Sequence, residues 1–194
     1  MINTKYRIIV TEIPHPESKE IFDKLDRYEA RSMHGQLPVV WDHALDFSVW
    51  DRWGNKWIDF TSGIFVANTG HSNPHIEHSI MKQIKQHLLY SYTFATEIRA
   101  EFLEKLISIT PPQFEKAFLM SSGTEATECA IKLARMRGMK INSTKNIIIS
   151  FQEAMHGRTM GAEMLKGDSK GSEWIGYKDP NMYHLRIPYP WEED

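Results

Sequence analysis

The sequence predicts an α/β fold in which helices pack against a mostly parallel sheet. A segment with helical periodicity, residues 123–137, lies between two short apolar runs at 117–120 and 145–151. The second run contains three consecutive isoleucines and is typical of a buried strand in a parallel sheet. Strand, helix and strand in this order require a right-handed crossover connection, which is the repeating unit of α/β proteins.

The composition excludes several classes of protein. A length of 194 residues is enough for one large domain or for one domain and a part. The net charge of −2 argues against a nucleic-acid-binding protein that relies on massed positive charge. No apolar run approaches the roughly 18 residues of a membrane-spanning helix, and the N-terminus lacks the apolar core of a secretory signal, so we expect a cytoplasmic protein. The single cysteine, Cys129, excludes an internal disulfide and a cysteine-rich zinc module.

The first third of the chain combines a helix, a hairpin and a loop. Pro16–Met33 opens with a proline and acidic residues and then carries apolar residues at helical spacing, which predicts a helix. Apolar and polar residues alternate over Phe47–Phe60 on both sides of the segment Asp51–Asn55, which predicts two strands joined by a turn. The stretch Thr61–His71 is rich in small residues and has no period, so it predicts a loop.

Two helices follow this loop. Asn73 is the expected N-cap and Pro74 the expected first residue of a helix that continues to about Leu89. The second helix covers Thr96–Thr110, and the prolines at positions 111 and 112 stop it.

The strand, helix and strand of the α/β unit come next. Ala117–Met120 is expected to be a buried strand, and the helix after it is expected to end near Arg137 with Gly138 as its C-cap. Lys145–Phe151 is expected to be a buried strand of the parallel type. Beyond Gly167 the composition predicts loop structure.

The turn between the first apolar run and the long helix is the most informative feature of the chain. Ser121–Thr124 places small hydroxyl residues and one glycine where the free N–H groups of a helix start and the helix dipole favour an anion. A plain capping box formed by Ser122 and Glu125 explains the same residues. The turn matches neither a Walker loop nor a nucleophile elbow. Glu125 and Glu128 are assigned no chemistry, because glutamates in the first turns of a helix are commonplace.

Four motifs occur in a specific order along the chain. They are Trp50–Phe60, Ser62–Pro74, Ser122–Arg135 and His156–Thr159. In this order they resemble the class III aminotransferases, which are fold-type I enzymes that use pyridoxal 5′-phosphate (PLP), and four ordered motifs are far more specific than any one. The resemblance implies that residues 1–72 form an N-terminal arm and a small-domain segment. It implies that residues 73–194 form the first part of the PLP-binding large domain, with the first half of its mostly parallel sheet.

The resemblance also implies which residues bind the cofactor. The backbone N–H groups of Gly123 and Thr124 would bind the PLP phosphate, helped by the side chains of Ser122 and Thr124, and the helix start predicts the same geometry. The family usually has an aromatic residue that stacks on the pyridine ring before the His-Gly-Arg-Thr motif. Here that residue is Met155, which packs against a ring without supplying a π face. His156 either contacts the cofactor or anchors its loop by hydrogen bonds.

The sequence contains one candidate residue for the substrate side of the pocket and none of the family's catalytic groups. Ile64 resembles the family residue that lines the substrate side of the pocket, and an ordinary core isoleucine is the alternative. In the family, the Schiff-base lysine and the aspartate that pairs with the pyridine nitrogen lie well downstream of His-Gly-Arg-Thr, so we expect no catalytic residue in this chain. Lys166 and Lys170 occupy a Gly-rich turn rather than the desolvated, rigid setting that a catalytic amine requires.

The resemblance implies a transaminase. The complete enzyme would move an amino group between an amino acid or omega-amine donor and a 2-oxo acid acceptor, and the motifs lean toward the transaminases of 4-aminobutyrate, ornithine and acetylornithine. We expect this chain to be the N-terminal portion of such an enzyme and to be inactive alone. A homodimer partner or a companion chain would cover its exposed half-sheet. The alternatives are an aminomutase of the glutamate-semialdehyde type and a non-catalytic or degenerate module of the same fold.

A zinc site is a further alternative. His71, His75 and His78 are spaced so that two of them share one helical face. No cysteine or aspartate joins them, and His71 belongs to the Gly-His loop of the family, so we expect no metal.

Overall fold

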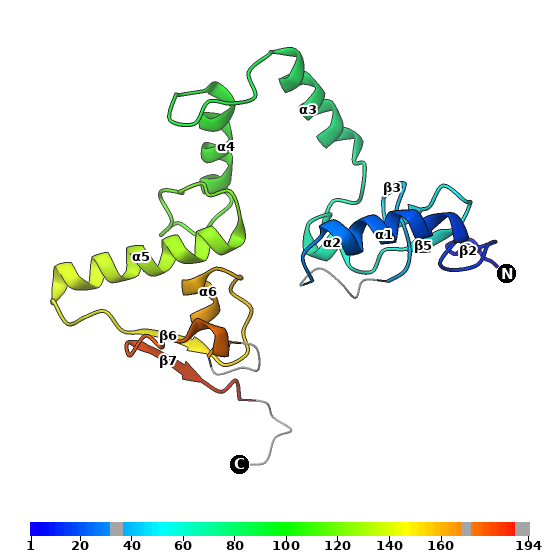
Figure 1. The fold of residues 1–194 in the computed structure, drawn as a ribbon. Helices are drawn as coiled ribbons and strands as arrows, with labels where there is room; N and C mark the ends of the chain where they lie inside the picture. The colour runs from blue at the N-terminus through cyan, green and yellow to red at the C-terminus, as the bar shows by residue number, and fades with distance from the viewer. Residues whose placement is uncertain (32–36, 168–171, 189–194) are drawn as a thin grey trace. The chain divides into compact units, whose positions relative to one another are not determined.

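The structure is a computed structural model that describes residues 1–31, 37–167 and 172–188. The chain divides into two compact units, Met1–Phe94 and Ala95–Asp194 (Figure 1). No helix in the described part of the chain is both long enough and apolar enough to cross a membrane.

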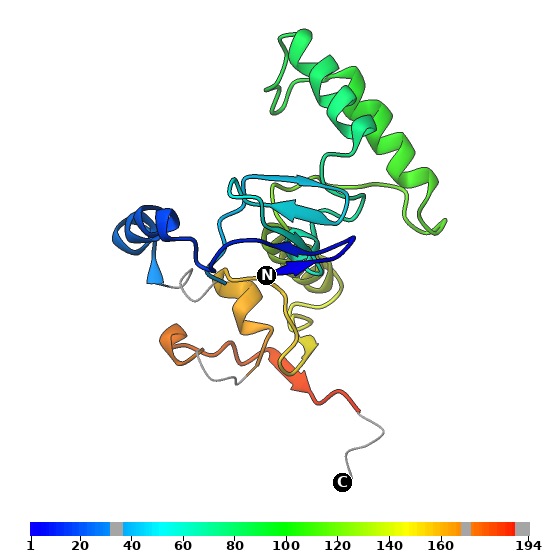
Figure 2. The same ribbon diagram turned by 90° about the vertical axis from the view of Figure 1, so that its right-hand side faces the viewer.

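The first unit is built on an antiparallel sheet with the strand order β1-β2-β5-β4-β3 (blue and cyan in Figure 2). Its strands are β1 (Ile2–Asn3), β2 (Ile8–Ile9), β3 (His43–Leu45), β4 (Ser48–Trp50) and β5 (Lys56–Ile58). Strands β4 and β5 pair with Val49 opposite Trp57, so the predicted hairpin is confirmed. The side chain of Val49 is buried.

Polar side chains of the hairpin turn form hydrogen bonds with the N-terminal segment that follows β2. Asn55 is fully buried, and its side-chain oxygen Oδ1 accepts hydrogen bonds from the backbone N–H groups of Val10 (2.8 Å) and Thr11 (3.2 Å). Its amide nitrogen donates to the carboxylate of Asp51 (2.6 Å), which also accepts from the Trp53 N–H (2.9 Å). The buried asparagine therefore holds two segments that are 44 residues apart in the sequence.

The predicted N-terminal helix is present but shorter than expected. It consists of a 3-10 turn η1 (Pro16–Ser18) followed by α1 (Lys19–Tyr28). The helix ends at Tyr28, because Glu29 has an extended backbone. The predicted continuation of the helix past Tyr28 is therefore wrong, and the predicted end itself, Met33, lies outside the described residues.

Helix α3 (Pro74–Lys85) begins as predicted. The side chain of Asn73 accepts a hydrogen bond from the His75 N–H (3.0 Å), which confirms the N-cap. The helix ends before Leu89 because His87 adopts a left-handed backbone with φ of 58°.

The second unit contains helices α4 (Glu97–Ser108) and α5 (Gly123–Ile141). Helix α4 confirms its prediction. Helix α5 begins where predicted but continues past Gly138, so the assignment of this glycine as a C-cap is wrong. Gly138 is buried inside the helix, where an added Cβ would lie 2.0 Å from the backbone oxygen of Lys145. The glycine therefore permits a close backbone approach rather than ending the helix.

Strands β6 (Ile148–Phe151) and β7 (Met182–Leu185) form a parallel pair, as predicted for the isoleucine-rich strand. The expectation of loop structure beyond Gly167 is wrong, because β7 and a 3-10 turn η3 (Glu173–Ile175) lie there. The pair is linked to the end of α6 (Met160–Met164) by a hydrogen bond from the buried Ser150 hydroxyl to the carbonyl of Leu165, the residue after the helix (2.6 Å).

One face of this pair is exposed, so the expected burial of β6 on both faces is wrong. Ile149 lies opposite Tyr183 and Phe151 opposite Leu185, and all four side chains are exposed. The sheet therefore presents a continuous apolar surface, named here the β6–β7 face.

The apolar run Ala117–Met120 is not a strand, which corrects the prediction. Phe118 is 74% exposed, and none of the described residues forms a ladder with this segment. A strand requires a neighbouring strand to satisfy its backbone groups, and local apolar composition cannot supply one.

Candidate cofactor site

Helix α5 starts at a capped turn. The Ser122 hydroxyl accepts a hydrogen bond from the Glu125 N–H (3.3 Å), and the Glu125 carboxylate accepts from the Ser121 N–H (2.9 Å). The capping interpretation of these residues is therefore confirmed, with the glutamate reaching back to Ser121. The cap uses the amide of Glu125, and the next amide, that of Ala126, donates to the Ser122 carbonyl (3.0 Å).

Two amides at this helix start remain open. No described residue accepts a hydrogen bond from the backbone N–H of Gly123 or of Thr124. Apart from the adjacent residues and the backbone of the helix itself, no described atom lies within 4 Å of the position that a Cβ on Gly123 would occupy, so the space beside Gly123 is open. Open amides and the positive end of the helix dipole together make this helix start a candidate anion site.

The loop that carries the His-Gly-Arg-Thr motif lies directly against this helix start. The Thr124 and Thr159 hydroxyls are 2.8 Å apart, and the Thr127 hydroxyl donates to the His156 carbonyl (3.0 Å). Gly157 has a φ of 139°, and an added Cβ would lie 2.1 Å from the Thr124 hydroxyl oxygen. Only glycine allows the loop to approach the helix this closely.

The structure therefore brings together two of the motifs that were assigned separately to the cofactor. The imidazole Nε2 of His156 is buried and has no hydrogen-bond partner among the described residues. Such a group is costly unless a partner occupies the site, which makes it a candidate ligand contact. The neighbouring Met155 side chain is 71% exposed.

Glu128 has a structural role that sequence reasoning missed. Its Oε1 accepts hydrogen bonds from the Gly161 N–H (2.9 Å), the Ala162 N–H (3.1 Å) and the Thr159 hydroxyl. It thereby caps helix α6 from a different helix. The sequence carries no signal for this contact, because Glu128 also fits the usual preference for acidic residues near a helix start.

Ile64 lies in the first unit, in the four-residue element α2 (Ser62–Phe65). Most of residues 61–71 form an irregular loop, as expected, but the segment contains this turn and an antiparallel bridge between His71 and Asp46. The backbone of the turn is left-handed, with φ of 59° at Gly63 and 63° at Ile64. A β-branched residue in this region is strained. The Ile64 side chain is 73% exposed, so it is not a buried core isoleucine in this structure.

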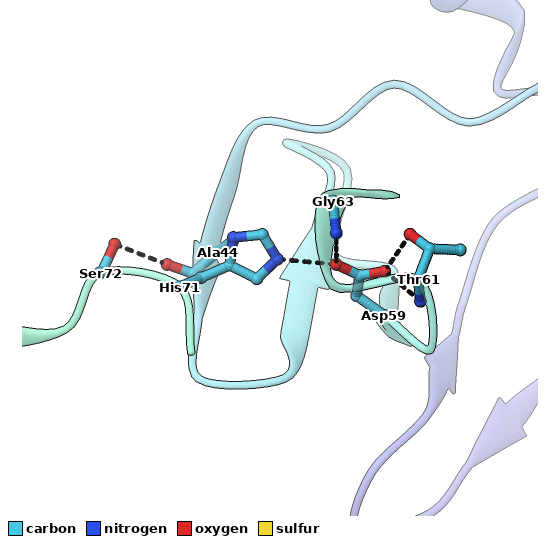
Figure 3. A network of polar contacts seen from close by, with 6 residues as sticks. All are labelled: Ala44, Asp59, Thr61, Gly63, His71 and Ser72. Atoms are coloured by element: carbon cyan, nitrogen blue, oxygen red, sulfur yellow. Dashed lines mark hydrogen bonds and ion pairs between the residues drawn. The ribbon is translucent and has the colours of Figure 1, made fainter. Parts of the chain in front are cut away.

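A buried carboxylate holds this turn (Figure 3). Asp59 accepts hydrogen bonds from the Thr61 N–H and hydroxyl, from the Gly63 N–H (2.9 Å) and from the His71 ring (2.8 Å). Burial opposes ionisation of Asp59, but these hydrogen bonds outweigh it and hold the pKa of this carboxyl well below its usual range.

The histidines of the alternative zinc site do not gather ligands. The His71 ring is bonded to Asp59, and in residues 1–31, 37–167 and 172–188 no group of three or more His, Cys, Asp or Glu side chains is placed to hold a metal ion.

Comparison with known proteins identifies the family. A family model described as aminotransferase class-III matches residues 29–194, which is most of the chain. The chain belongs to the class-III aminotransferases. An acetylornithine aminotransferase of Methanosarcina acetivorans is 33% identical over 175 residues, which covers 90% of this chain and 41% of the relative. An ornithine aminotransferase of Saccharomyces cerevisiae is 36% identical over 159 residues, which covers 80% of this chain and 37% of the relative.

The solved structures agree with this assignment. Taurine:2-oxoglutarate aminotransferase from Bifidobacterium kashiwanohense, in complex with PLP and glutamate, matches with a TM-score of 0.76 and 25% identity over 93% of this chain. The match covers 39% of that protein. This class-III aminotransferase chain therefore has the α/β fold of part of a fold-type I PLP-dependent transferase, and PLP is the cofactor of its family. It spans between 37% and 41% of the length of the three relatives named.

The residues at the start of α5 fit one part of that cofactor. A phosphate monoester needs several hydrogen-bond donors and a favourable local field. The open amides of Gly123 and Thr124 and the end of the helix dipole supply both.

Proposed function

We propose that this chain supplies the phosphate-binding part of a PLP-dependent aminotransferase. The single observation that carries the proposal is the pair of unpartnered amides, Gly123 and Thr124, at the capped start of a 19-residue helix. Ser122 keeps the helix start ordered by capping it, so the two amides point to the ligand without reorganisation.

The ring of the cofactor would lie near Met155 and His156. The exposed thioether of Met155 offers an apolar surface on which a ring packs. The unpartnered Nε2 of His156 offers a hydrogen-bonding group to a polar substituent of the ring or to a water bound beside it. When bound, PLP supplies an electron sink that makes the Cα–H of an attached amino acid acidic.

The complete enzyme would transfer an amino group between an amino acid or omega-amine and a 2-oxo acid. The names of the acetylornithine and ornithine aminotransferases to which the chain is similar support a donor of the ornithine type. Ile64 would lie on the substrate side, where its exposed apolar side chain would contact the hydrocarbon part of the donor. In this assignment residues 1–72 are the arm and small-domain segment and residues 73–194 the start of the large domain.

The Schiff-base lysine would come from the portion of the enzyme that the relatives have in addition to this segment. Lys166 is placed for another contact, because its Nζ lies 3.7 Å from the Glu163 carboxylate one turn away on α6, and Lys170 lies outside the described residues. The same additional portion, in one polypeptide or in a companion chain, would cover the β6–β7 face. Without it, the chain would bind the phosphate and transfer no amino group.

The experiment that tests the proposal removes the N–H of one of the two amides. Gly123 is the first residue of α5, a position where proline is well tolerated, and Ser122 before it is already extended. Gly123→Pro therefore deletes the N–H, whereas Gly123→Ala keeps it. A hydrogen bond to a charged group is worth about 1.5–3 kcal/mol, so we expect the PLP dissociation constant to rise about 10- to 100-fold in the proline variant only.

Equilibrium dialysis of the chain with PLP and with phosphate-free pyridoxal measures this effect. The proline variant should lose affinity for PLP and keep its affinity for pyridoxal, while the alanine variant should match the unmodified chain for both. Equal PLP affinity in the two variants would overturn the assignment of the amides, and absence of PLP binding by the unmodified chain would overturn the proposal as a whole.

A further inference from the structure

An anion site at the start of α5 has an unexpected neighbour, because the first two turns of this helix carry two carboxylates. Glu128 lies five residues beyond Gly123, about 7.5 Å along the helix axis. A negative charge at that distance repels a phosphate, so a purely electrostatic view predicts that Glu128 weakens the site. Its contacts indicate the opposite role.

The carboxylate of Glu128 determines the direction of a hydrogen-bond chain. An ionised carboxylate only accepts hydrogen bonds, so the single hydroxyl hydrogen of Thr159 must point to Glu128 Oε1. The Thr159 oxygen is then free to accept from the Thr124 hydroxyl, 2.8 Å away. The Thr124 oxygen in turn accepts from the Thr159 N–H (3.4 Å). The Thr124 hydroxyl thus donates to the Thr159 hydroxyl, which in turn donates to the Glu128 carboxylate.

This series of hydrogen bonds holds the Thr124 side chain in one orientation. With its hydroxyl hydrogen committed to Thr159, Thr124 presents only its backbone N–H to a ligand. The same Glu128 oxygen accepts from the Gly161 and Ala162 N–H groups, so the His-Gly-Arg-Thr loop and the start of α6 are fixed to α5 at this point. The negative charge of Glu128 is compensated by the three donors that it accepts from, the Thr159 hydroxyl and the Gly161 and Ala162 N–H groups.

We propose that Glu128 is a positioning residue for the phosphate site: acting through Thr159, it holds Thr124 and the His-Gly-Arg-Thr loop in the arrangement that leaves the Gly123 and Thr124 amides open. This inference rests on the proposed function for the identity of the ligand. In this proposal the Thr124 hydroxyl contacts the loop, whereas the resemblance implies that this side chain helps to bind the phosphate.

The electrostatic view and the positioning view predict opposite changes in PLP affinity when Glu128 is replaced. Removing a carboxylate near an anion site strengthens binding by charge alone, whereas losing the positioning contacts weakens it. Glu128→Ala, which removes both the charge and the hydrogen-bond acceptor, is therefore compared with a variant that removes the charge alone. Glu128→Gln is the conservative variant, since its amide oxygen still accepts from the Thr159 hydroxyl and the α6 amides.

The experiment measures dissociation constants of the chain for PLP and for pyridoxal. We expect Glu128→Ala to raise the PLP dissociation constant about tenfold without changing the pyridoxal constant, and Glu128→Gln to stay within about threefold of the unmodified chain. Tighter PLP binding by Glu128→Ala, or an equal loss for PLP and pyridoxal, would overturn the positioning role.

A measurement without ligand keeps this test separate from the proposed function. Amide hydrogen exchange in Glu128→Ala should be faster at Thr159, Gly161 and Ala162, whose N–H groups donate to Thr124 or to Glu128, and unchanged in the C-terminal half of α5. Unchanged exchange at these residues would refute the inference even if the unmodified chain bound no PLP. Faster exchange together with absent PLP binding would leave the positioning contacts supported and the proposed ligand wrong.

Discussion

Replacing Gly138 by alanine should destabilise the second unit, although the same change in most helices is stabilising. Alanine is favoured over glycine in a helix interior by about 1 kcal/mol. Here the new Cβ would lie 2.0 Å from the Lys145 backbone oxygen, and ordinary contact begins at 3.4 Å. The carbonyl would have to move by about 1.4 Å, and overpacking of this kind costs about 1–3 kcal/mol or more.

The turn that would have to move is itself tied to the helix. The Asn142 N–H donates to the Gly138 carbonyl (2.9 Å), and the Lys145 N–H donates to the Asn142 carbonyl (2.9 Å). Because the next residues enter β6, the shift reaches the strand, and we place the overpacking cost at the upper end of its range. The net loss is then about 2 kcal/mol of unfolding free energy, or a fall in Tm of about 8–16 °C for a unit of this size.

Urea denaturation followed by far-UV circular dichroism measures this loss, with Gly123→Ala as the matched control. Gly123 lies in the same helix but has no atom within 4 Å of the added Cβ, so that variant should be equal to or more stable than the unmodified chain. A Gly138→Ala variant as stable as the Gly123→Ala variant would refute the reasoning, since it would show that the close approach to Lys145 carries no cost.

Three further predictions concern the buried polar groups and the cofactor ring. Because the hydrogen bonds hold the pKa of Asp59 below its unfolded value, the unfolded chain binds the proton first, and stability should fall as the pH drops below about 4; Asp59→Asn should flatten this dependence in acid denaturation curves. Asn55→Ala should cost about 2–4 kcal/mol in urea denaturation, because it leaves the Val10 and Thr11 amides and the Asp51 carboxylate without their buried partner. Met155→Phe should lower the PLP dissociation constant several-fold in equilibrium dialysis, because it adds a π face; unchanged or weaker binding would show that Met155 does not face the ring.

The features that the sequence predicted are those with local causes. The cap at Asn73 and the start of α5 at Ser122 each depend on residues within one helical turn, and the β4–β5 hairpin depends on strict alternation around a short turn. The candidate phosphate site could be located for the same reason, since a helix start with a glycine and hydroxyl residues is visible in a few consecutive positions.

The features that the sequence did not predict depend on distant partners. Gly138 looks like a helix end until Lys145 is placed beside it, and Phe118 lies in an apolar run that has no neighbouring strand among the described residues. Strand β7 was missed because it is only four residues long and contains His184, and the pairing with β6 that forms it is not visible in the local sequence. Glu128 fits a local rule so well that its contact with Gly161, 33 residues away, could not be suspected.

The two helix starts at this site explain why only one of them is open to a ligand. Helices α5 and α6 both begin with free amides, and both therefore attract negative charge. At α6 the chain supplies that charge itself, because Glu128 accepts from the Gly161 and Ala162 amides. At α5 the Ser122 cap takes the Glu125 amide, and the amides of Gly123 and Thr124 have no acceptor among the described residues. A helix start is thus a candidate anion site only after its internal acceptors have been counted, and by that count the Gly161 and Ala162 amides of α6 are occupied whereas the Gly123 and Thr124 amides of α5 are open.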